Sequence, residues 1–252
     1  MSVAVITGAT SGLGREYVNA VMDECPKVDE IWLIARRKKR MEKIQATYPQ
    51  MNFRIIELDL AQDESYLKFA EILRQKQPRI SAVIANAGVA YNGDVFDMSE
   101  KQIRMMIDLN VKGTTIFVRE CLRYMVRGSF VLLVSSVSSF VPNPDLAVYS
   151  STKFYVTSFG LALREELKNR QINVCTAMPG MMKTEMVDKL SRTVRSSTFN
   201  LVPSLNVPKF AHKTIKAAQS GKASYTMLAF YKAYRVVAKL VPHRLLIRFT
   251  KI

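Results

Sequence analysis

The sequence has few of the residues that cross-link secreted domains or bind metals. Its 252 residues include three cysteines, Cys25, Cys121 and Cys175, which lie too far apart for a Cys-x-x-Cys pattern. Such an odd, widely spaced set indicates a reducing compartment and unpaired core cysteines. The two histidines, His212 and His243, lie outside every motif, and we expect them to be surface or packing residues. The sequence therefore lacks the histidines that a Ser-His-Asp hydrolase or a zinc dehydrogenase needs within its motifs. We expect no metal site.

Long hydrophobic runs and linker segments are also missing. No uninterrupted apolar stretch reaches the roughly 18 residues that a membrane-spanning helix needs. The first ten residues have the pattern of a buried strand and a glycine turn, so we expect no signal peptide and a cytoplasmic protein. Glycine and proline are scattered rather than gathered between two halves, which predicts one domain over residues 1–252.

Acidic residues are absent from the last quarter of the chain. The last of them is Asp188, and residues 189–252 contain 13 Lys or Arg side chains and no Asp or Glu. The formal net charge of +16 therefore arises mainly in this quarter. A basic surface attracts anionic substrates or anionic surfaces. Nucleic-acid binding would fit the charge alone, without a recognised motif, and we expect no nucleic-acid partner.

Short β-branched runs alternate along the chain with stretches of helical periodicity. The expected strands cover Val3–Ile6, Ile31–Ala35, Phe53–Leu58, Ser81–Ala85, Ser129–Val134 and Ile172–Ala177. The expected helices cover Leu13–Glu24, Arg36–Thr47, Glu64–Gln75, two stretches within Ser99–Val126, and Val148–Lys168. This alternation is typical of an α/β fold with a doubly wound, Rossmann-type parallel sheet and helices on both faces.

A glycine-rich turn follows the first expected strand. Gly8, Gly12 and Gly14 are spaced G-x-x-x-G-x-G between this strand and the next helix. Glycine lets the backbone turn tightly and approach a pyrophosphate, which the helix N-terminus then stabilises. No Lys-Ser/Thr pair follows, so the turn is not a Walker loop. We predict a dinucleotide site bordered by Gly8, Thr10, Ser11, Gly12, Leu13 and Gly14.

The end of the second expected strand indicates which cofactor binds. A dinucleotide without a 2′-phosphate usually meets a carboxylate here, which accepts from the ribose hydroxyl. This chain has Arg36 and Arg37 instead, and a guanidinium binds a phosphate through two parallel hydrogen bonds. We therefore predict NADP(H), with Arg36 as the first choice and Arg37 as the second. Asp59, after the third strand, is placed to accept from the adenine amino group or to serve as a loop or helix-capping residue.

Tyr149 and Lys153 stand four residues apart near the start of the last long expected helix. Such a pair shares one helix face, so the ammonium can lie near the phenol and lower its pKa. Tyr-x-x-x-Lys alone is common by chance. Ser136 lies thirteen residues upstream of the tyrosine, at the end of the fifth strand, where open parallel sheets place their ligands. Together the three residues predict an acid–base site.

Six motifs in this order resemble those of the short-chain dehydrogenase/reductase family. They are Thr7–Gly14, Asn86-Ala-Gly88, Asn110 within Leu109–Gly113, Ser135-Ser136, Tyr149–Lys153, and Pro179-Gly180 with Thr184. The resemblance runs from residue 3 to about residue 187. It implies an NADP(H)-dependent oxidoreductase that interconverts a ketone and a secondary alcohol, and it implies a homo-oligomer.

The resemblance also implies a role for each matched residue. Tyr149 would donate a proton to the carbonyl oxygen, or remove it in alcohol oxidation, and Ser136 would hydrogen-bond that oxygen. Lys153 would lower the tyrosine pKa and hold the nicotinamide ribose, while Asn110 would support a water-mediated proton relay to it. Cofactor contacts would come from Asn86, Gly88, Pro179, Gly180 and Thr184. Ser135 would be a loop hydrogen-bonding residue, because the family's serine lies thirteen positions before the tyrosine.

Apolar residues are frequent within residues 181–225, which we expect to form a substrate flap and cap. They include Met181, Met182, Met186, Leu190, Phe199, Leu201 and Val202, with Val137, Phe140 and Val141 as candidates for the opposite wall. Methionine adapts to irregular apolar ligands. These residues favour a lipophilic substrate, such as a steroid or a long-chain acyl ketone, in contact with Ser136, Tyr149, Met181 and Met182. Ordinary core packing would explain the same composition.

The last segment, residues 226–252, is basic, and its apolar residues recur at helical spacing. Such a helix can lie on an anionic bilayer, or it can pack on its own domain or on a partner subunit. The sequence is compatible with two functions. The first is a reductase or dehydrogenase, and the second is a non-catalytic NADP(H)-binding regulator or membrane-associated binding protein. Loss of a catalytic residue would favour the second, and no such residue is lost.

Overall fold

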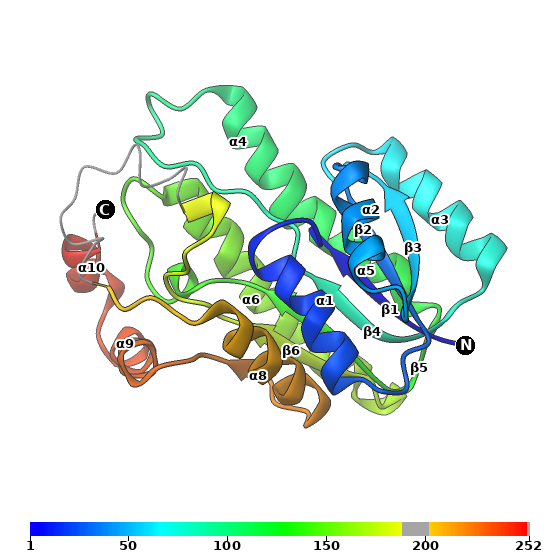
Figure 1. Cartoon of the computed structure of the whole chain (residues 1–252). Helices are drawn as coiled ribbons and strands as arrows, with labels where there is room; N and C mark the ends of the chain where they lie inside the picture. The colour runs from blue at the N-terminus through cyan, green and yellow to red at the C-terminus, as the bar shows by residue number, and fades with distance from the viewer. Residues whose placement is uncertain (188–201, 251–252) are drawn as a thin grey trace.

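Seven parallel strands form one sheet at the centre of the protein (Figure 1). The computed structural model describes residues 1–187 and 202–250. The strands are β1 Ser2–Thr7, β2 Glu30–Ala35, β3 Asn52–Glu57, β4 Arg79–Ala85, β5 Met125–Val134, β6 Asn173–Ala177 and β7 Ser224–Tyr225. Their order in the sheet is β3-β2-β1-β4-β5-β6-β7. The predicted doubly wound fold in a single domain is confirmed.

Helices cover both faces of the sheet. One face carries α1 Gly12–Glu24, α2 Lys38–Thr47 and α8 Val207–Gln219. The other carries α3 Glu64–Lys76, α5 Thr114–Leu122 and α6 Ala147–Leu167. Shorter elements are α4 Glu100–Ile107, the π-helical turn η1 Asp108–Gly113, and the 3-10 turns η2 Val137–Ser139 and η3 Lys168–Arg170. The chain ends in α9 Ala229–Leu240, α10 His243–Leu246 and η5 Ile247–Phe249.

The central strands are hydrophobic throughout because both of their faces are buried. In β1, Ala4 and Ile6 point to the core under α1 and α8, and Val3 and Val5 point to the core under α3 and α5. Successive side chains of a strand alternate between faces, so a strand covered on both sides has no polar face. All three cysteines are buried and unpaired in these cores, as the sequence predicted.

Two helix boundaries differ by more than one residue from the sequence-based expectation. Helix α2 begins at Lys38 rather than Arg36, because Arg37 has a non-helical backbone with φ −100° and ψ 80°. Both arginines therefore lie in the loop after β2. The expected helix up to Val126 ends at Leu122 instead, because Met125 already pairs with Ile80 at the start of β5. The short strand β7 was not predicted, since two residues carry too little periodicity to be recognised.

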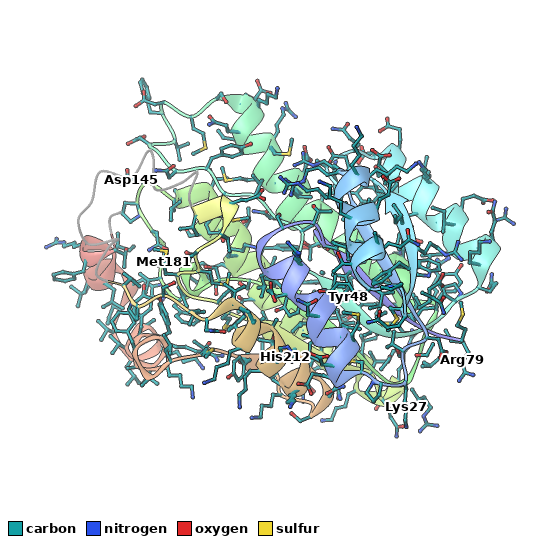
Figure 2. The ribbon with its side chains drawn as sticks, viewed as in Figure 1. Lys27, Tyr48, Arg79, Asp145, Met181 and His212 are labelled. Atoms are coloured by element: carbon teal, nitrogen blue, oxygen red, sulfur yellow. The ribbon has the colours of Figure 1, made fainter. Side chains whose placement is uncertain are left out.

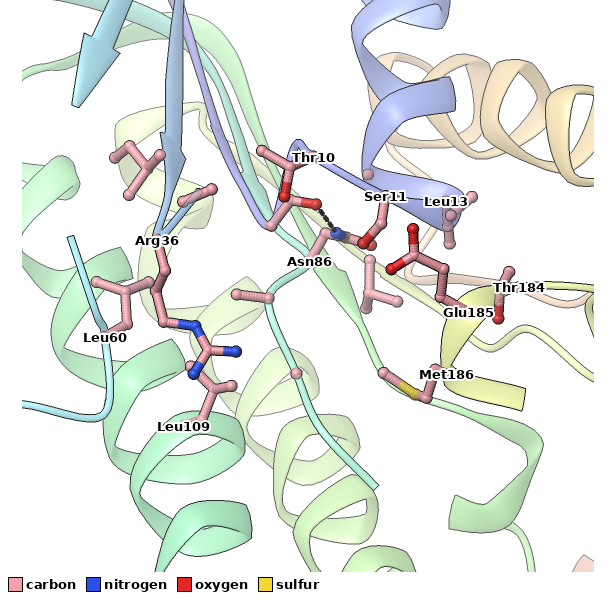
Figure 3. A pocket seen from close by; sticks show the side chains of 18 of the residues that line it. Thr10, Ser11, Leu13, Arg36, Leu60, Asn86, Leu109, Thr184, Glu185 and Met186 are labelled. Atoms are coloured by element: carbon pink, nitrogen blue, oxygen red, sulfur yellow. Dashed lines mark hydrogen bonds between the residues drawn. The ribbon is translucent and has the colours of Figure 1, made fainter. Parts of the chain in front are cut away.

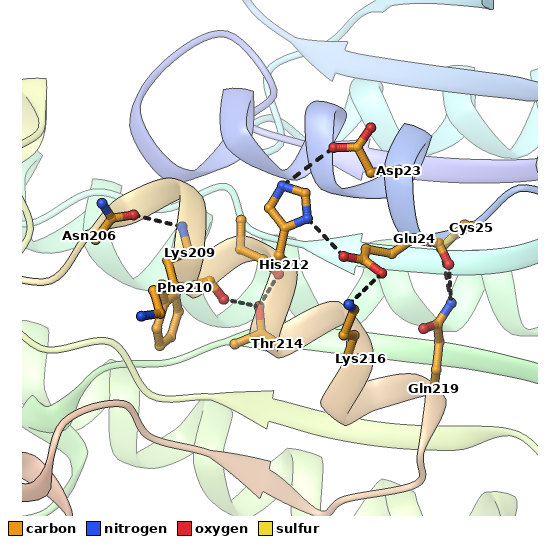
Figure 4. Close-up of polar contacts among 11 residues, drawn as sticks. Asp23, Glu24, Cys25, Asn206, Lys209, Phe210, His212, Thr214, Lys216 and Gln219 are labelled. Carbon is orange, nitrogen blue, oxygen red and sulfur yellow. Dashed lines mark hydrogen bonds and ion pairs between the residues drawn. The ribbon is translucent and has the colours of Figure 1, made fainter.

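Helix α8 is fastened to α1 by polar contacts (Figure 4). The ring of His212 lies 3.0 Å from Glu24 through Nδ1 and 3.6 Å from Asp23 through Nε2. Lys216 Nζ lies 3.1 Å from the other oxygen of Glu24. These partners lower the pKa of Glu24, with the hydrogen bond from His212 as the largest cause. His212 is therefore a packing residue between two helices, as the sequence predicted.

The carboxyl ends of the strands point to the end of the molecule that also holds the C-terminal helices (Figures 1 and 2). Asp145 and Met181 lie at that end, whereas Lys27, which precedes β2, and Arg79, the first residue of β4, lie at the opposite end. In a parallel sheet this edge is where ligands bind. Within the described ranges, no helix combines the length and the apolar character that crossing a membrane requires.

Candidate active site

The first strand ends in a glycine turn that is tied to the end of β4. The hydroxyl Oγ1 of Thr7 accepts hydrogen bonds from the backbone N–H groups of Asn86 and Ala87, both at 3.0 Å. The Asn86 amide donates to the carbonyl oxygen of Thr7 at 3.1 Å. Asn86 thus holds two strand ends together, and its neighbour Ala87 borders the adjacent cleft.

Glycine is required where this turn meets helix α1. Gly8 and Gly12 have φ angles of +66° and +50°, in the left-handed region that disfavours side chains. A Cβ on Gly14 would lie 2.0 Å from the carbonyl oxygen of Gly8, so no side chain fits there. The turn therefore brings bare backbone to the N-terminus of α1, as a pyrophosphate site needs.

A cleft runs along the carboxyl edge of the sheet from this turn (Figure 3). Of the residues predicted to bind cofactor, those on its wall are Gly8, Thr10, Ser11, Gly12, Leu13, Gly14, Arg36, Arg37, Asp59, Asn86, Gly88, Tyr149, Lys153, Pro179 and Thr184. Gly180 is not on this wall. The sequence did not single out further wall residues, among them Ile34, Leu58, Leu60, Ala87, Leu109, Val134 and Glu185.

Basic side chains gather at the end of the cleft beside β2 and β3. Arg36 Nη1 lies 3.7 Å from Asp59, whose other oxygen accepts from the backbone N–H of Ala61 at 3.1 Å. Arg37 donates to Thr10 Oγ1 of the glycine turn at 3.1 Å. Both arginines border the cleft and are more than two-fifths exposed, at 60% and 43% of their side chains. They can therefore reach a phosphate on the cofactor ribose.

Glu185 joins the two sides of this end of the cleft. Its carboxylate lies 3.1 Å from Arg37 and 2.6 Å from Arg40, both on the α2 side. The two guanidinium groups, Arg40 first, lower the pKa of Glu185, so it is ionised at neutral pH. Sequence reasoning missed Glu185 because its partners lie about 145 positions away along the chain.

Ser135 and Ser136 follow β5 and face different partners. Ser135 Oγ donates to the backbone carbonyl of Lys153 at 2.8 Å, which anchors helix α6 to the strand end. Ser136 Oγ accepts from the backbone N–H of Ser138 at 3.1 Å and also hydrogen-bonds the Tyr149 hydroxyl. The structure therefore brings Ser136 to the tyrosine, and Ser135 acts as a hydrogen-bonding residue beneath it.

Tyr149 and Lys153 lie on one face of α6. Lys153 Nζ stands 5.6 Å from the centre of the Tyr149 ring and donates to the carbonyl oxygen of Val134 at 3.0 Å. The Lys153 side chain reaches through the protein, and the residue is only 5% exposed. Burial lowers the pKa of Lys153 to about 8. The ammonium is therefore charged at neutral pH.

The pKa of Tyr149 differs from the sequence-based expectation. Burial raises it to about 12, and the hydrogen bond with Ser136 opposes this rise without cancelling it. The expected lowering by Lys153 is not what the structure shows, because desolvation of the phenolate outweighs the other influences. A phenol with a raised pKa stays protonated at neutral pH. That form can donate a proton.

Asn110 sits in the π-helical turn η1 and is fully buried. Its side-chain oxygen accepts from the backbone N–H of Val89, and its amide donates to the carbonyl of Val89, both at 2.8 Å. A Cβ on Gly88 would lie 3.2 Å from Asn110 Oδ1 and 3.5 Å from Lys153 Nζ. Gly88, Asn110 and Lys153 therefore lie next to one another. A π-helical turn often marks a functional site because it redirects one side chain.

The turn after β6 forms another part of the cleft wall. Met182 and Met186 border the cleft, whereas Met181 does not. The backbone N–H of Met181 donates to the Tyr231 hydroxyl at 2.9 Å, and a Cβ on Gly180 would lie 2.1 Å from the Tyr231 ring. Gly180 thus serves packing against α9. Leu190, Phe199 and Leu201, which were predicted to line the flap, lie outside the described residues.

The chemical groups that line the cleft fit a dinucleotide. The bare glycine turn, the helix N-terminus and the exposed arginines are the donor groups that a pyrophosphate and a ribose phosphate require. Within residues 1–187 and 202–250, no three His, Cys, Asp or Glu side chains gather as metal ligands.

Comparison with known proteins agrees with this geometry. The family profile described as short chain dehydrogenase matches residues 2–195. An uncharacterized oxidoreductase of Staphylococcus saprophyticus is 31% identical over 193 residues, which cover 75% of this chain and 77% of that protein.

Solved structures of low sequence identity share the fold. A short-chain dehydrogenase from Sphingobium yanoikuyae in complex with NADPH has a TM-score of 0.76 and 21% identity, over 95% of this chain and 94% of that chain. A 3-ketoacyl-(acyl-carrier-protein) reductase from Brucella melitensis complexed with NADH has a TM-score of 0.74 and 19% identity, over 89% of this chain and 93% of that chain. At such identity the likeness is one of fold alone.

Proposed function

The chain belongs to the short-chain dehydrogenase/reductase family of oxidoreductases, and on that basis we propose that it reduces a lipophilic ketone to a secondary alcohol with NADPH. The observation that carries the proposal is that Tyr149 and Lys153 border a cleft that fits a dinucleotide, with Ser136 beside the Tyr149 hydroxyl. NADPH, when bound, supplies the hydride, and the protein supplies orientation and the proton.

In this proposal Tyr149 is the proton donor. Its raised pKa keeps the phenol protonated at neutral pH, which suits reduction better than alcohol oxidation. Ser136 hydrogen-bonds the phenol and would hydrogen-bond the substrate oxygen as charge develops there. The buried Lys153 ammonium would stabilise the phenolate left after proton transfer, because the two opposite charges lie in a poorly solvated site.

Asn110 would position the site rather than touch the substrate. Its two hydrogen bonds to the backbone of Val89 fix the segment that carries Gly88 beside Lys153. Its amide also donates to Thr152 Oγ1 at 3.1 Å, which ties η1 to helix α6. We propose that Asn110 holds the water-mediated route that runs past Lys153 and returns a proton to the Tyr149 phenolate.

The cofactor groups assigned from sequence divide between two ends of the cleft. Arg36 and Arg37 would bind the 2′-phosphate, and Asp59 would accept from the adenine amino group. The nicotinamide end would be held by Asn86, Gly88, Tyr149, Lys153, Pro179 and Thr184, whereas Gly180, also assigned from sequence, packs against the Tyr231 ring. Residues 181–225 would form the flap and cap. Met182 and Met186 support an apolar substrate, because both border the cleft near the turn after β6.

The proposal is tested by following NADPH oxidation with a panel of ketones that increase in apolar size, from small ketones to steroid and long-chain acyl ketones. We expect turnover to rise with apolar size. A non-catalytic cofactor-binding regulator would bind NADPH tightly and turn over no member of the panel. That outcome would refute the reductase and favour the regulator.

Replacing either arginine of the strand end is expected to change cofactor preference. Arg36→Ala and Arg37→Ala should each weaken NADPH binding by about ten- to hundredfold, because each removes charge-assisted hydrogen bonds to the 2′-phosphate. NADH binding should hardly change. The measurement is NADPH and NADH affinity by quenching of protein fluorescence, with the exposed Lys39→Ala as the matched control. Equal losses for both cofactors would show that neither arginine binds the 2′-phosphate.

Removing the carboxylate of Glu185 is expected to have the opposite effect. Because Glu185 occupies Arg37 and Arg40, a 2′-phosphate must compete with it for the same guanidinium groups. Glu185→Gln should tighten NADPH binding by about two- to fivefold, the range of an exposed ion pair. Glu42→Gln makes the same charge change on α2, where Glu42 pairs with Lys38, and should have no effect. Weaker NADPH binding in Glu185→Gln would contradict the competition.

A further inference from the structure

Helix α9 has two apolar faces, and only one of them is covered. Tyr231 and Ala238 are 1% and 6% exposed and pack toward the domain. On the other side of the helix, Phe230, Val237 and Leu240 are 54%, 42% and 78% exposed. At 100° per residue these three side chains fall within one arc, roughly opposite the buried pair. The sequence pattern could not distinguish the two faces, because both are apolar.

Exposed apolar side chains also occur in the segment after α9. Val236 lies on the uncovered side of α9, and after the proline at the end of the helix Leu245 and Phe249 are 50% and 82% exposed, while Leu246 and Ile247 pack in one small core with Ala238. We call this set the apolar–basic face: Phe230, Val236, Val237, Leu240, Leu245 and Phe249, with the exposed cations Lys232, Lys239, Arg244 and Arg248. A gathering of exposed large apolar side chains on one surface marks a contact with a partner or a membrane.

The cations of this face have no acidic neighbours among the residues that the structure describes. Among residues 1–187 and 202–250, no carboxylate lies within ion-pair distance of Lys232, Lys239, Arg244 or Arg248. The sequence explains why, since no Asp or Glu follows Asp188. Most of the acidic residues elsewhere in the chain have a basic partner close by. The positive charge of the apolar–basic face is therefore available to a binding partner outside the chain.

The positive charge of this face distinguishes between two possible binding partners, a second copy of the chain and an anionic bilayer. A second copy of the chain, docked through the same face about a twofold axis, would bring four cations opposite the same four cations without a carboxylate between them. An anionic bilayer supplies the complementary charge, and it accepts apolar side chains below its headgroups. We propose that the apolar–basic face docks the protein on an anionic membrane surface, with α9 lying in the plane of the interface.

The docked helix would lie against the substrate side of the cleft. The Tyr231 hydroxyl donates to the carbonyl of Pro203 at 2.7 Å and accepts from the backbone N–H of Met181 at 2.9 Å. Ala238 packs with Phe140 and Met178 in a small core beside the strand ends. Contact with the bilayer would therefore place the mouth of the cleft near the lipid. This second step rests on the proposed reductase function, whereas docking itself does not.

The test is co-sedimentation of the full chain with vesicles of phosphatidylcholine containing about one third phosphatidylglycerol, compared with pure phosphatidylcholine. We expect binding to the anionic vesicles only, weakened at least tenfold between low and high salt because the cations act through screened charge. Leu240→Ser with Phe249→Ser should weaken binding at least tenfold, and Lys232→Gln with Lys239→Gln should do the same. Leu67→Ser with Lys68→Gln on α3 is the control, since Leu67 is 76% exposed there.

Each variant is first checked for unchanged NADPH binding, so that a folding defect is not mistaken for lost docking. Absence of binding to anionic vesicles, or equal binding by the face variants and the α3 control, would overturn the proposal. Loss of self-association in the face variants, measured by analytical ultracentrifugation without lipid, would assign the face to a second copy instead. Vesicle binding needs no substrate. A chain that docks but reduces no ketone would refute the proposed function alone.

Discussion

Tyr149→Phe is expected to lower the rate of ketone reduction by about a thousandfold, the middle of the range for loss of a general acid. The change removes one hydroxyl and keeps the ring, so the packing beside Lys153 is preserved. The carbonyl oxygen would then have to take its proton from water. The rate is measured from single-turnover NADPH oxidation with the best ketone of the panel, where product release does not mask the chemical step.

The controls for Tyr149→Phe separate chemistry from binding. NADPH affinity should stay within about twofold of the parent chain, because the hydroxyl faces Ser136 and the substrate rather than the phosphates. Tyr155→Phe on the same helix removes a hydroxyl that bonds Thr115 at 3.0 Å, outside the cleft, and should leave the rate unchanged. Tyr149→Phe with full activity would remove the tyrosine from the mechanism.

Lys153→Met is expected to make the protein less active and more stable at the same time. The activity should fall by about a hundredfold or more, because the phenolate loses its neighbouring cation and the cofactor ribose loses a donor. The stability should rise because burial lowers the pKa of Lys153 from 10.5 to about 8, so folding removes a charged ammonium from water. That shift corresponds to about 3 kcal/mol, reduced by about 1 kcal/mol for the lost hydrogen bond to Val134.

The stability gain of Lys153→Met depends on pH in a fixed direction. Between pH 8 and pH 10.5 the unfolded chain binds a proton that the folded chain has released, so the parent gains stability as the pH rises. The variant has no such group. Its advantage in free energy of unfolding should therefore be largest below pH 8 and should vanish near pH 10.5, as measured by urea unfolding without cofactor. A pH-independent difference would show that packing, and not the charge, is responsible.

The fold could be predicted from local pattern because each strand and helix carries its own periodicity. The Val3–Ile6 run and the glycine turn after it are short-range features, and the structure places them as β1 and the start of α1. The spacing of Tyr149 and Lys153 on one helix face follows from helix geometry alone. Ser136 could be chosen over Ser135 because family spacing was available, and the structure gives the two serines different partners.

The features that the sequence could not supply all depend on contacts between distant segments. Glu185 meets Arg37 and Arg40 only because the chain crosses the cleft after β6. Tyr231 packs under Gly180 from a helix some fifty positions later. The direction of the Tyr149 pKa also depends on burial by the whole domain, so the residues of one helix could not reveal it.

Helix α9 is a further feature that the sequence pattern did not determine. Its sequence has apolar residues at helical spacing, which is equally compatible with packing on the domain and with an exposed membrane-facing side. The structure buries Tyr231 against the domain and leaves Leu240 exposed. Periodicity identifies an apolar face but does not say what covers it.

We propose that this chain transfers a hydride from NADPH to a ketone carbon while Tyr149 supplies the proton. The most direct measurement uses NADPH carrying deuterium at the transferable position, with the best lipophilic ketone, followed by mass spectrometry and NMR of the product. We predict one deuterium on the carbinol carbon of the alcohol, and none when Tyr149→Phe is incubated for the same time. NADPH binding without deuterium in any product, across the whole ketone panel, would contradict the account.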